Sequence, residues 1–262
     1  TMCTLMEEFP DFRFSQSQCS AYAMAEEADP ALFARVKEKI RGGQWEVTAS
    51  AWVEHDSNLP SGESLARQIT MAQAYTEKEF GLRPTVQWAP DTFGHSANVP
   101  QLLRKSGITR YFHSRCFPDT QEDYEKKIRR HSATYPLYDW EGQDGSRVLT
   151  ATEEYGGEFS IEKAVDKALQ AEKEGRTHSL LLYGVCDHGG GPTRRDIRHI
   201  LSCDSSPMLP RMVMSTIADY FDAAEGEESQ LYLHRGDLNT IFEGCYTSHA
   251  DIKGHNRRME AL

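Results

Sequence analysis

The sequence predicts an α/β fold with a parallel, barrel-like sheet. Short strand-like stretches alternate with helix-like stretches along most of the 262 residues. This alternation is typical of parallel sheets with right-handed crossovers, either open or closed into a barrel. In addition, polar loops follow three of the predicted strands, at the sheet edge where α/β folds place functional side chains. The alternation gives way to a final helix near residues 236–244, where we expect a boundary.

Capping residues and glycines mark the helices of the first half. Asp29 and Pro30 begin a helix that ends at Gly42, and Ser61 begins another that ends at Gly81. In the second of these helices, Leu65, Ile69, Ala72 and Thr76 share one face. A third helix is expected at residues 100–106. The expected strands of this half are 45–51, 84–88 and 110–113.

The second half continues the pattern after a stretch without clear periodicity over residues 114–145. A loop of that length inside a compact domain is usually functional or mobile. Ser160 begins a helix that Gly175 ends, and residues 179–183 form an apolar run expected for a strand covered on both faces. Three more helices are expected: one at 193–201, one that runs through Phe221 and one at 250–262. The remaining strand-like stretches are 147–151, 211–215 and 230–234.

Composition excludes several classes of partner. The net charge of -11 argues against binding a nucleic-acid backbone. No apolar run approaches the roughly 20 residues of a membrane helix, and no signal peptide is visible. The 6 cysteines form no CxxC pair, which favours a reduced, cytoplasmic chain. Because the sequence starts at Thr1 in mid-pattern, we expect a fragment of a longer protein.

Three loops carry the candidate chemistry. They are residues 52–58, residues 88–98 with Asp91, and the glycine-rich residues 183–193 with Asp187. Each brings carboxylates to the carboxyl-terminal edge of the expected sheet. Two carboxylates that face each other across a pocket are what a glycosidase needs, one at the anomeric carbon and one for proton transfer.

Two of these loops have an alternative interpretation. Asp91 could simply cap the following helix, and Trp88 and Phe93 could fill a core instead of stacking on a sugar. The glycine-rich loop could bind phosphate, although it lacks the spacing of a P-loop or dinucleotide site. His95, His188 and His249 lie near these loops. A lone histidine is more often structural, but Asp91 with one or more of them could hold a metal ion such as zinc.

Four blocks together resemble the glycoside hydrolase family 38 α-mannosidases. Residues 88–103 (WAPDTFGHSANVPQLL) are similar to the nucleophile segment of that family, and residues 52–65 (WVEHDSNLPSGESL) to its upstream block. Residues 183–193 (YGVCDHGGGPT) resemble its acid/base loop, and residues 244–253 (GCYTSHADIK) the segment that leads into its helical bundle. The resemblance implies a catalytic α/β domain over residues 1–240 and the start of a helical domain over residues 241–262.

The resemblance also implies site residues and a cofactor. It identifies Asp91 as the nucleophile and a zinc ligand, and Asp187 as the acid/base carboxylate, with Cys186 where a glycine is usual. The residues implied to border the sugar are Trp52, Glu54, Asp56, Asn58, Trp88, Phe93, His95 and His188. Two features depart from the family: no zinc motif precedes Phe12, and Phe242 replaces a histidine ligand, for which His249 or His234 could substitute.

We therefore expect a zinc-dependent retaining α-mannosidase that acts on mannose-containing oligosaccharides. Homo-oligomerisation is compatible with this prediction, whereas nucleic acid and membrane are not expected as partners. Two alternatives stay open: an inactive sugar-binding remnant, and a metal-dependent deacetylase on a similar barrel.

Overall fold

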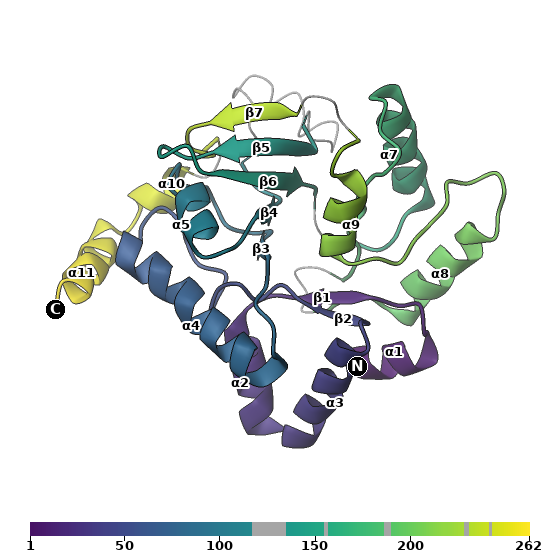
Figure 1. The fold of residues 1–262 in the computed structure, drawn as a ribbon, viewed down its shortest axis with the longest axis horizontal. Helices are drawn as coiled ribbons and strands as arrows, with labels where there is room; N and C mark the ends of the chain where they lie inside the picture. The colour runs from purple at the N-terminus through teal and green to yellow at the C-terminus, as the bar shows by residue number, and fades with distance from the viewer. Residues whose placement is uncertain (117–134, 155–156, 186–189, 228–230, 241–242) are drawn as a thin grey trace. The chain divides into compact units, whose positions relative to one another are not determined.

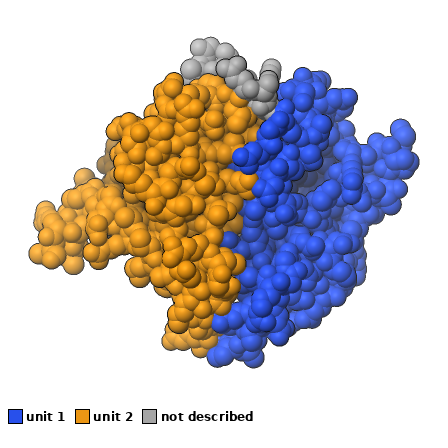
Figure 2. Space-filling model, viewed as in Figure 1, with its two compact units in different colours: residues 1–16, 29–47, 153–230 blue, residues 17–28, 48–152, 231–262 orange. Residues whose placement is uncertain are grey.

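The computed structural model describes residues 1–116, 135–154, 157–185, 190–227, 231–240 and 243–262 (Figure 1). Contacts divide the chain into two compact units, coloured separately in Figure 2. Unit 1 comprises residues 1–16, 29–47 and 153–230, and unit 2 comprises residues 17–28, 48–152 and 231–262. Both units are discontinuous in sequence, so neither follows from a simple division of the chain.

Unit 1 holds a small sheet and helices. Its strands β1 (Phe14–Gln16) and β2 (Trp45–Val47) pair in parallel, with Phe14 opposite Trp45. Two apolar clusters stabilise it, one around Phe12 and Ile197 and one around Phe159 and Ile200. The helices are α1 (Met2–Glu8), α3 (Pro30–Arg41), α7 (Ile161–Lys173), α8 (Arg194–Asp204) and α9 (Ile217–Ala224).

A carboxylate from the small sheet contacts the start of helix α9, whose N-cap is Thr216. Glu46, in β2, accepts hydrogen bonds from the main-chain N–H groups of Ile217 at 3.0 Å and Ala218 at 2.9 Å. The hydroxyl of Ser15 in β1 also donates to it. Burial raises the pKa of Glu46, although these hydrogen bonds favour its ionised form. The first N–H groups of a helix have no partner within the helix, so Glu46 supplies one and complements the helix dipole.

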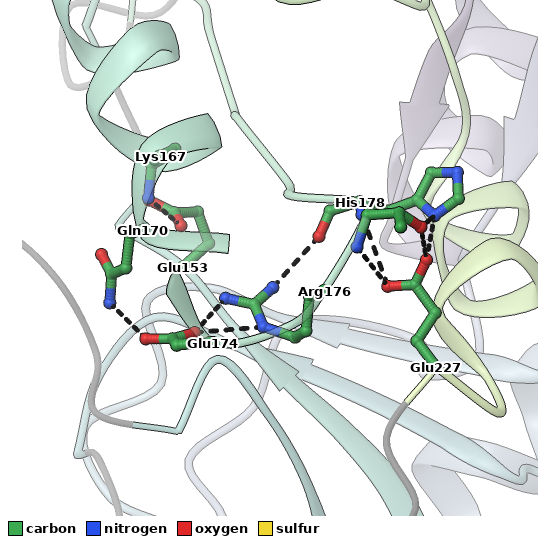
Figure 3. Close-up of polar contacts among 8 residues, drawn as sticks. Glu153, Lys167, Gln170, Glu174, Arg176, His178 and Glu227 are labelled. Carbon is green, nitrogen blue, oxygen red and sulfur yellow. Dashed lines mark hydrogen bonds and ion pairs between the residues drawn. The ribbon is translucent and has the colours of Figure 1, made fainter. Parts of the chain in front are cut away.

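Charged side chains also tie the end of α7 to the end of α9 (Figure 3). The buried guanidinium of Arg176 donates to Glu174 and, at 3.1 Å, to the carbonyl of His178. Glu227, just after α9, accepts from the main-chain N–H groups of Thr177 at 3.2 Å and His178 at 3.3 Å. These bonds fix the start of the segment that runs toward residues 183–185.

Unit 2 is built on a five-stranded sheet with the order β3-β4-β6-β5-β7. Strands β3, β4 and β6 are parallel, β5 is antiparallel to β6, and β5 and β7 are parallel. A core that includes Tyr111, Tyr138 and Trp140 packs against the sheet. The strands are β3 (Val86–Ala89), β4 (Arg110–His113), β5 (Leu137–Glu141), β6 (Arg147–Thr152) and β7 (Tyr232–Arg235).

The helices of unit 2 begin and end where local chemistry allows. In α4 (Gly62–Phe80), the Ser61 hydroxyl accepts from the N–H of Ser64, and Gly81 ends the helix in the left-handed region at φ 71°. Its buried face includes the predicted residues Leu65, Ile69, Ala72 and Thr76. The other helices are α2 (Cys19–Ala28), α5 (Val99–Lys105), α10 (Glu243–Thr247) and α11 (Ala250–Glu260).

Several sequence-based predictions need correction. The sheet of unit 2 is mixed, because a turn with Gly145 at φ 81° returns β6 antiparallel to β5, which the sequence did not indicate. The predicted strand 45–51 is too long: β2 ends at Val47, and directly after it the main chain turns, with the N–H of Ser50 donating to the carbonyl of Thr48 at 2.8 Å. The mixed α/β class is confirmed, whereas closure into a barrel, a C-terminal helical bundle and the boundary at residue 240 stay predictions.

Two further predicted strands do not form. Residues 179–183 and 211–215 belong to no strand in the described part of unit 1. Instead of pairing with a neighbour, Leu181, Tyr183, Met212 and Met214 pack against the cluster around Phe159 and Ile200. Their apolar character therefore reflects packing on helices. Among the residues described, no helix combines the length and the apolar character needed to cross a bilayer.

Candidate active site

Asp91 lies at the carboxyl end of β3, on a loop that is anchored on several sides. Two main-chain hydrogen bonds, each 2.9 Å long, join His95 in this loop to Leu238. The Ser57 hydroxyl donates to the carbonyl of Gly94 at 2.7 Å. Gly94 has φ 110°, and a Cβ atom there would lie 2.3 Å from Oδ1 of Asn239. Only glycine satisfies both the left-handed backbone and this close approach.

The carboxylate of Asp91 is held at one oxygen. Nε and Nη2 of Arg115 lie 3.0 and 2.9 Å from Oδ1. Oδ2 has no hydrogen-bond partner among the described residues, and the side chain of Asp91 is 47% exposed. Asp91 caps no helix, because Asn98 occupies the N-cap position of α5. This arrangement holds one oxygen of an exposed carboxylate and leaves the other without a partner in the described contacts.

A second carboxylate supports the main chain of Asp91. Oε1 of Glu54 accepts from the N–H of Asp91 at 2.6 Å. Burial raises the pKa of Glu54, and the nearby charge of Asp91 adds to this rise. Glu54 therefore contacts the candidate nucleophile at the main-chain N–H of Asp91, and not at its carboxylate.

The other residues of the first loop have structural contacts of their own. Oδ1 of Asp56 accepts from the N–H groups of Asn58 at 2.7 Å and Leu59 at 2.8 Å, which closes a tight turn. Nδ2 of Asn58 donates to Oδ1 of Asn239 at 2.8 Å. The ring of Trp52 packs edge-on against Tyr75 with centroids 5.8 Å apart. The structure thus brings Glu54 to Asp91, whereas Asp56 and Asn58 hold the loop itself.

Aromatic residues flank the loop of Asp91. Trp88 stacks on Phe112, with centroids 4.1 Å apart and planes 15° apart, and stays half-buried. The ring of Phe93 lies 6.0 Å from the guanidinium carbon of Arg115. His95 is completely buried, and both of its ring nitrogens have hydrogen-bond partners. His95 therefore supports the loop from within the core and does not present its ring to a ligand.

The metal site expected around Asp91 is not assembled by the residues that the structure describes. No group of three or more His, Cys, Asp or Glu side chains in the described ranges could hold a metal ion. His249 is exposed and precedes α11 with a left-handed backbone at φ 47°. Catalytic zinc usually has three protein ligands. The described side chains do not fit that requirement, and Asp91 is already engaged by Arg115.

Some predicted residues lie outside the described ranges, and one site residue escaped prediction. Asp187, His188, Cys186 and Phe242 fall on residues that the structure does not describe. Arg115 was not predicted as a site residue, although it follows the expected strand 110–113 by two positions. Strand ends along one edge of a parallel sheet were the signal that could have identified it.

Comparison with known proteins identifies the family. The model of the glycosyl hydrolases family 38 N-terminal domain matches residues 1–242. Over 99% of this chain, the sequence is 37% identical to alpha-mannosidase G of Dictyostelium discoideum. Over all of this chain, it is 36% identical to mouse alpha-mannosidase 2C1. It spans only 24% and 25% of these relatives.

A solved structure agrees with this assignment at the level of fold. An alpha-mannosidase from Enterococcus faecalis V583 superposes on 90% of this chain, and on 27% of its own, with a TM-score of 0.69 and 23% sequence identity. The family model covers most of the chain and includes both Asp91 and Asp187. The chain therefore belongs to glycosyl hydrolase family 38, within its N-terminal domain.

Proposed function

We propose that this chain carries the catalytic carboxylates of an α-mannosidase that cleaves its substrate with retention of configuration. The observation that carries the proposal is the geometry of Asp91 in a family 38 chain. Its carboxylate is exposed at a strand end, with Oδ1 fixed by Arg115 and Oδ2 without a partner among the described residues. An oriented carboxylate with a free oxygen is what attack on an anomeric carbon requires.

The proposed reaction is a double displacement. Oδ2 of Asp91 forms a bond to the anomeric carbon while Asp187 donates a proton to the departing oxygen. Asp187 then removes a proton from water, which attacks the anomeric carbon and releases Asp91. Arg115 and Glu54 keep Asp91 oriented in both steps, through its carboxylate and its peptide N–H.

For zinc, the proposal is limited to naming the ligand that this chain would contribute. When bound, the ion would hold sugar hydroxyl groups and favour distortion of the ring. Asp91 is the ligand that this chain would contribute, with His249 as the second candidate. Since the described residues do not form a complete set, no step above depends on the ion.

We propose mannose-containing oligosaccharides as the substrate class. Membership in family 38 favours a glycosidase over the alternative of a deacetylase on a similar barrel. An inactive sugar-binding remnant remains the alternative that activity measurements must exclude. Such a remnant would bind mannosides without turnover.

The test uses the full protein and two aryl α-mannosides that differ in leaving group. Asp91→Ala should abolish turnover of both, and Asp187→Ala should slow the poorer leaving group far more than the activated one, which needs little protonation. Asp144→Asn, in the β5–β6 turn, is the control and should leave the rate unchanged. The anomer formed first, read by NMR, should be the α form.

Trapping and geometry complete the test. A slow fluorinated mannosyl substrate should label the peptide that contains Asp91, as detected by mass spectrometry. In an experimental structure, the carboxyl groups of Asp91 and Asp187 should lie about 5 to 5.5 Å apart. An equal loss on both substrates for Asp187→Ala, or inversion of configuration, would refute the assigned roles.

A further inference from the structure

The main-chain carbonyl of Arg115 is held by two buried histidines. Nδ1 of His113 lies 2.7 Å from this oxygen, and Nε2 of His95 lies 3.2 Å from it. The other nitrogen of each ring meets a tyrosine: the hydroxyl of Tyr111 lies 2.7 Å from Nδ1 of His95, and that of Tyr138 lies 2.7 Å from Nε2 of His113. All four side chains are at most 2% exposed.

These contacts determine the tautomer of each histidine. A carbonyl oxygen only accepts hydrogen bonds, so each ring must present an N–H to it. His95 therefore carries its hydrogen on Nε2, and His113 carries its hydrogen on Nδ1. The remaining nitrogens accept from the two tyrosine hydroxyls. The two chains of hydrogen bonds, from Tyr111 through His95 and from Tyr138 through His113, converge on one peptide group.

Burial keeps this arrangement neutral and therefore fixed. It lowers the pKa of His113 to about 4 and that of His95 well below its ordinary value. The two rings also lie close together, with centroids 4.9 Å apart. A charged ring would lose its acceptor nitrogen and with it the tyrosine hydrogen bond.

The carbonyl that they hold sits at a strained point of the chain. The next residue, Cys116, is buried and has φ 61°, a left-handed conformation that costs energy for any residue other than glycine. Strain of this kind persists where the surroundings fix the backbone. Here the two histidines hold the carbonyl before Cys116, and the guanidinium of the same residue, Arg115, contacts Asp91.

We propose that His95 and His113 are positioning residues, which set the direction of Arg115 and, through it, of the Asp91 carboxylate. Neither ring touches Asp91 in the contacts described, so their effect on it is indirect. The catalytic consequence rests on the proposed function, whereas the positioning of Arg115 is a property of the structure alone.

The test exploits the difference in reach between asparagine and glutamine. The amide nitrogen of asparagine occupies the place of Nδ1 of histidine, and that of glutamine the place of Nε2. His113→Asn and His95→Gln therefore keep a donor toward the Arg115 carbonyl, whereas His113→Gln and His95→Asn misplace it. Both pairs introduce a neutral amide into the same core, so a purely structural role would not separate them.

Two readouts are taken on the full protein with an aryl α-mannoside. We expect the matched variants to keep most of kcat, and the mismatched variants to lose on the order of 10- to 100-fold in kcat with KM little changed. Crystal structures of the four variants should show the Arg115–Asp91 pair intact in the matched variants and broken in the mismatched ones. Ile108→Val, a change elsewhere in the same core, controls for lost stability.

The outcomes separate this inference from the proposed function. Equal kcat values across the four variants, or an intact Arg115–Asp91 pair in all of them, would overturn the positioning role. If the wild-type protein hydrolyses no α-mannoside, the proposed function fails, and the crystal structures still decide the positioning. Should a mismatched variant not fold, His95→Ala or His113→Ala, which removes the donor toward the Arg115 carbonyl, replaces it, and loss of the pair is the expected result.

Discussion

Asp91 and Arg115 each lie two residues beyond a register pair of neighbouring parallel strands. Ala89 in β3 is opposite His113 in β4, so the two side chains emerge together at the same edge of the sheet. Nε and Nη2 of Arg115 both reach Oδ1 of Asp91. The register of two strands is thus sufficient to place the charge partner of the candidate nucleophile.

The first prediction tests this ion pair. Arg115→Ala should reduce kcat on aryl α-mannosides by about 100-fold, since a misplaced nucleophile is costly and no other cation is seen to fix Oδ1 in the described contacts. Arg115→Lys keeps the charge but loses the planar pair of N–H donors, so its kcat should lie between those of the wild type and Arg115→Ala. Steady-state kinetics check this. A rate for Arg115→Ala close to that of the wild type would show that the pair is not catalytic.

The second prediction concerns Glu54. Glu54→Gln keeps an oxygen that can accept the N–H of Asp91, whereas Glu54→Leu removes it. We expect Glu54→Gln to keep most of kcat and Glu54→Leu to lose about tenfold or more, because a donor left without its acceptor costs about 1–3 kcal/mol. Kinetics and melting temperatures are measured together. Equal activity of the two variants would contradict the role.

Local sequence signals predicted the helices of this chain well. Asp29, Ser61 and Ser160 cap helices as expected, with side-chain oxygens that accept from Leu32, Ser64 and Lys163. The sequence could not reveal that β5 runs antiparallel, because direction depends on which strands pair. It also could not separate the apolar run at residues 179–183 from a strand, since packing on helices selects the same residues.

The site was predictable in part. Asp91 follows a strand and belongs to a recognisable block, so the sequence sufficed to find it. Arg115 and the buried roles of His95 and His113 depend on contacts between β3, β4 and β5, which lie far apart along the chain. Residue type alone does not distinguish a histidine that faces a ligand from one inside a core.

The third prediction concerns the hydrogen bonds of Glu46 to the start of α9. Glu46→Ala should destabilise this helix by about 1–2 kcal/mol, because two of its first N–H groups lose their acceptor. Hydrogen exchange of peptides that cover residues 217–224 should increase. Glu7→Ala, which breaks an exposed pair with Arg35, is the matched control and should change exchange there little. Equal exchange in both variants would argue against a stabilising role of Glu46.

The fourth prediction is a pH dependence of stability. The folded chain holds His113 neutral down to about pH 4, whereas in the unfolded chain it takes up a proton near its ordinary pKa of 6.5. Its contribution is thus complete above pH 6.5 and is lost as the pH falls toward 4, by up to ~3 kcal/mol. Denaturant unfolding of the wild type and of His113→Asn should show a shallower acid decline in the variant. Parallel curves would contradict this assignment.

The fifth prediction concerns zinc. Tight binding needs about four ligands, three of them from protein in catalytic sites. In the described ranges, no three His, Cys, Asp or Glu side chains come together for this. The 262-residue chain alone should therefore lose zinc readily to a chelator. In the full protein, Asp91→Asn should lower the zinc content measured by mass spectrometry, with Asp144→Asn as the control.

The same measurement decides where the ligands lie. If the 262-residue chain retains stoichiometric zinc after chelation, the prediction is wrong and the ligands are within it. His249→Ala and His234→Ala then identify them. If Asp91→Asn leaves the zinc content of the full protein unchanged, Asp91 is no ligand. Its ion pair with Arg115 is then the arrangement in which it acts.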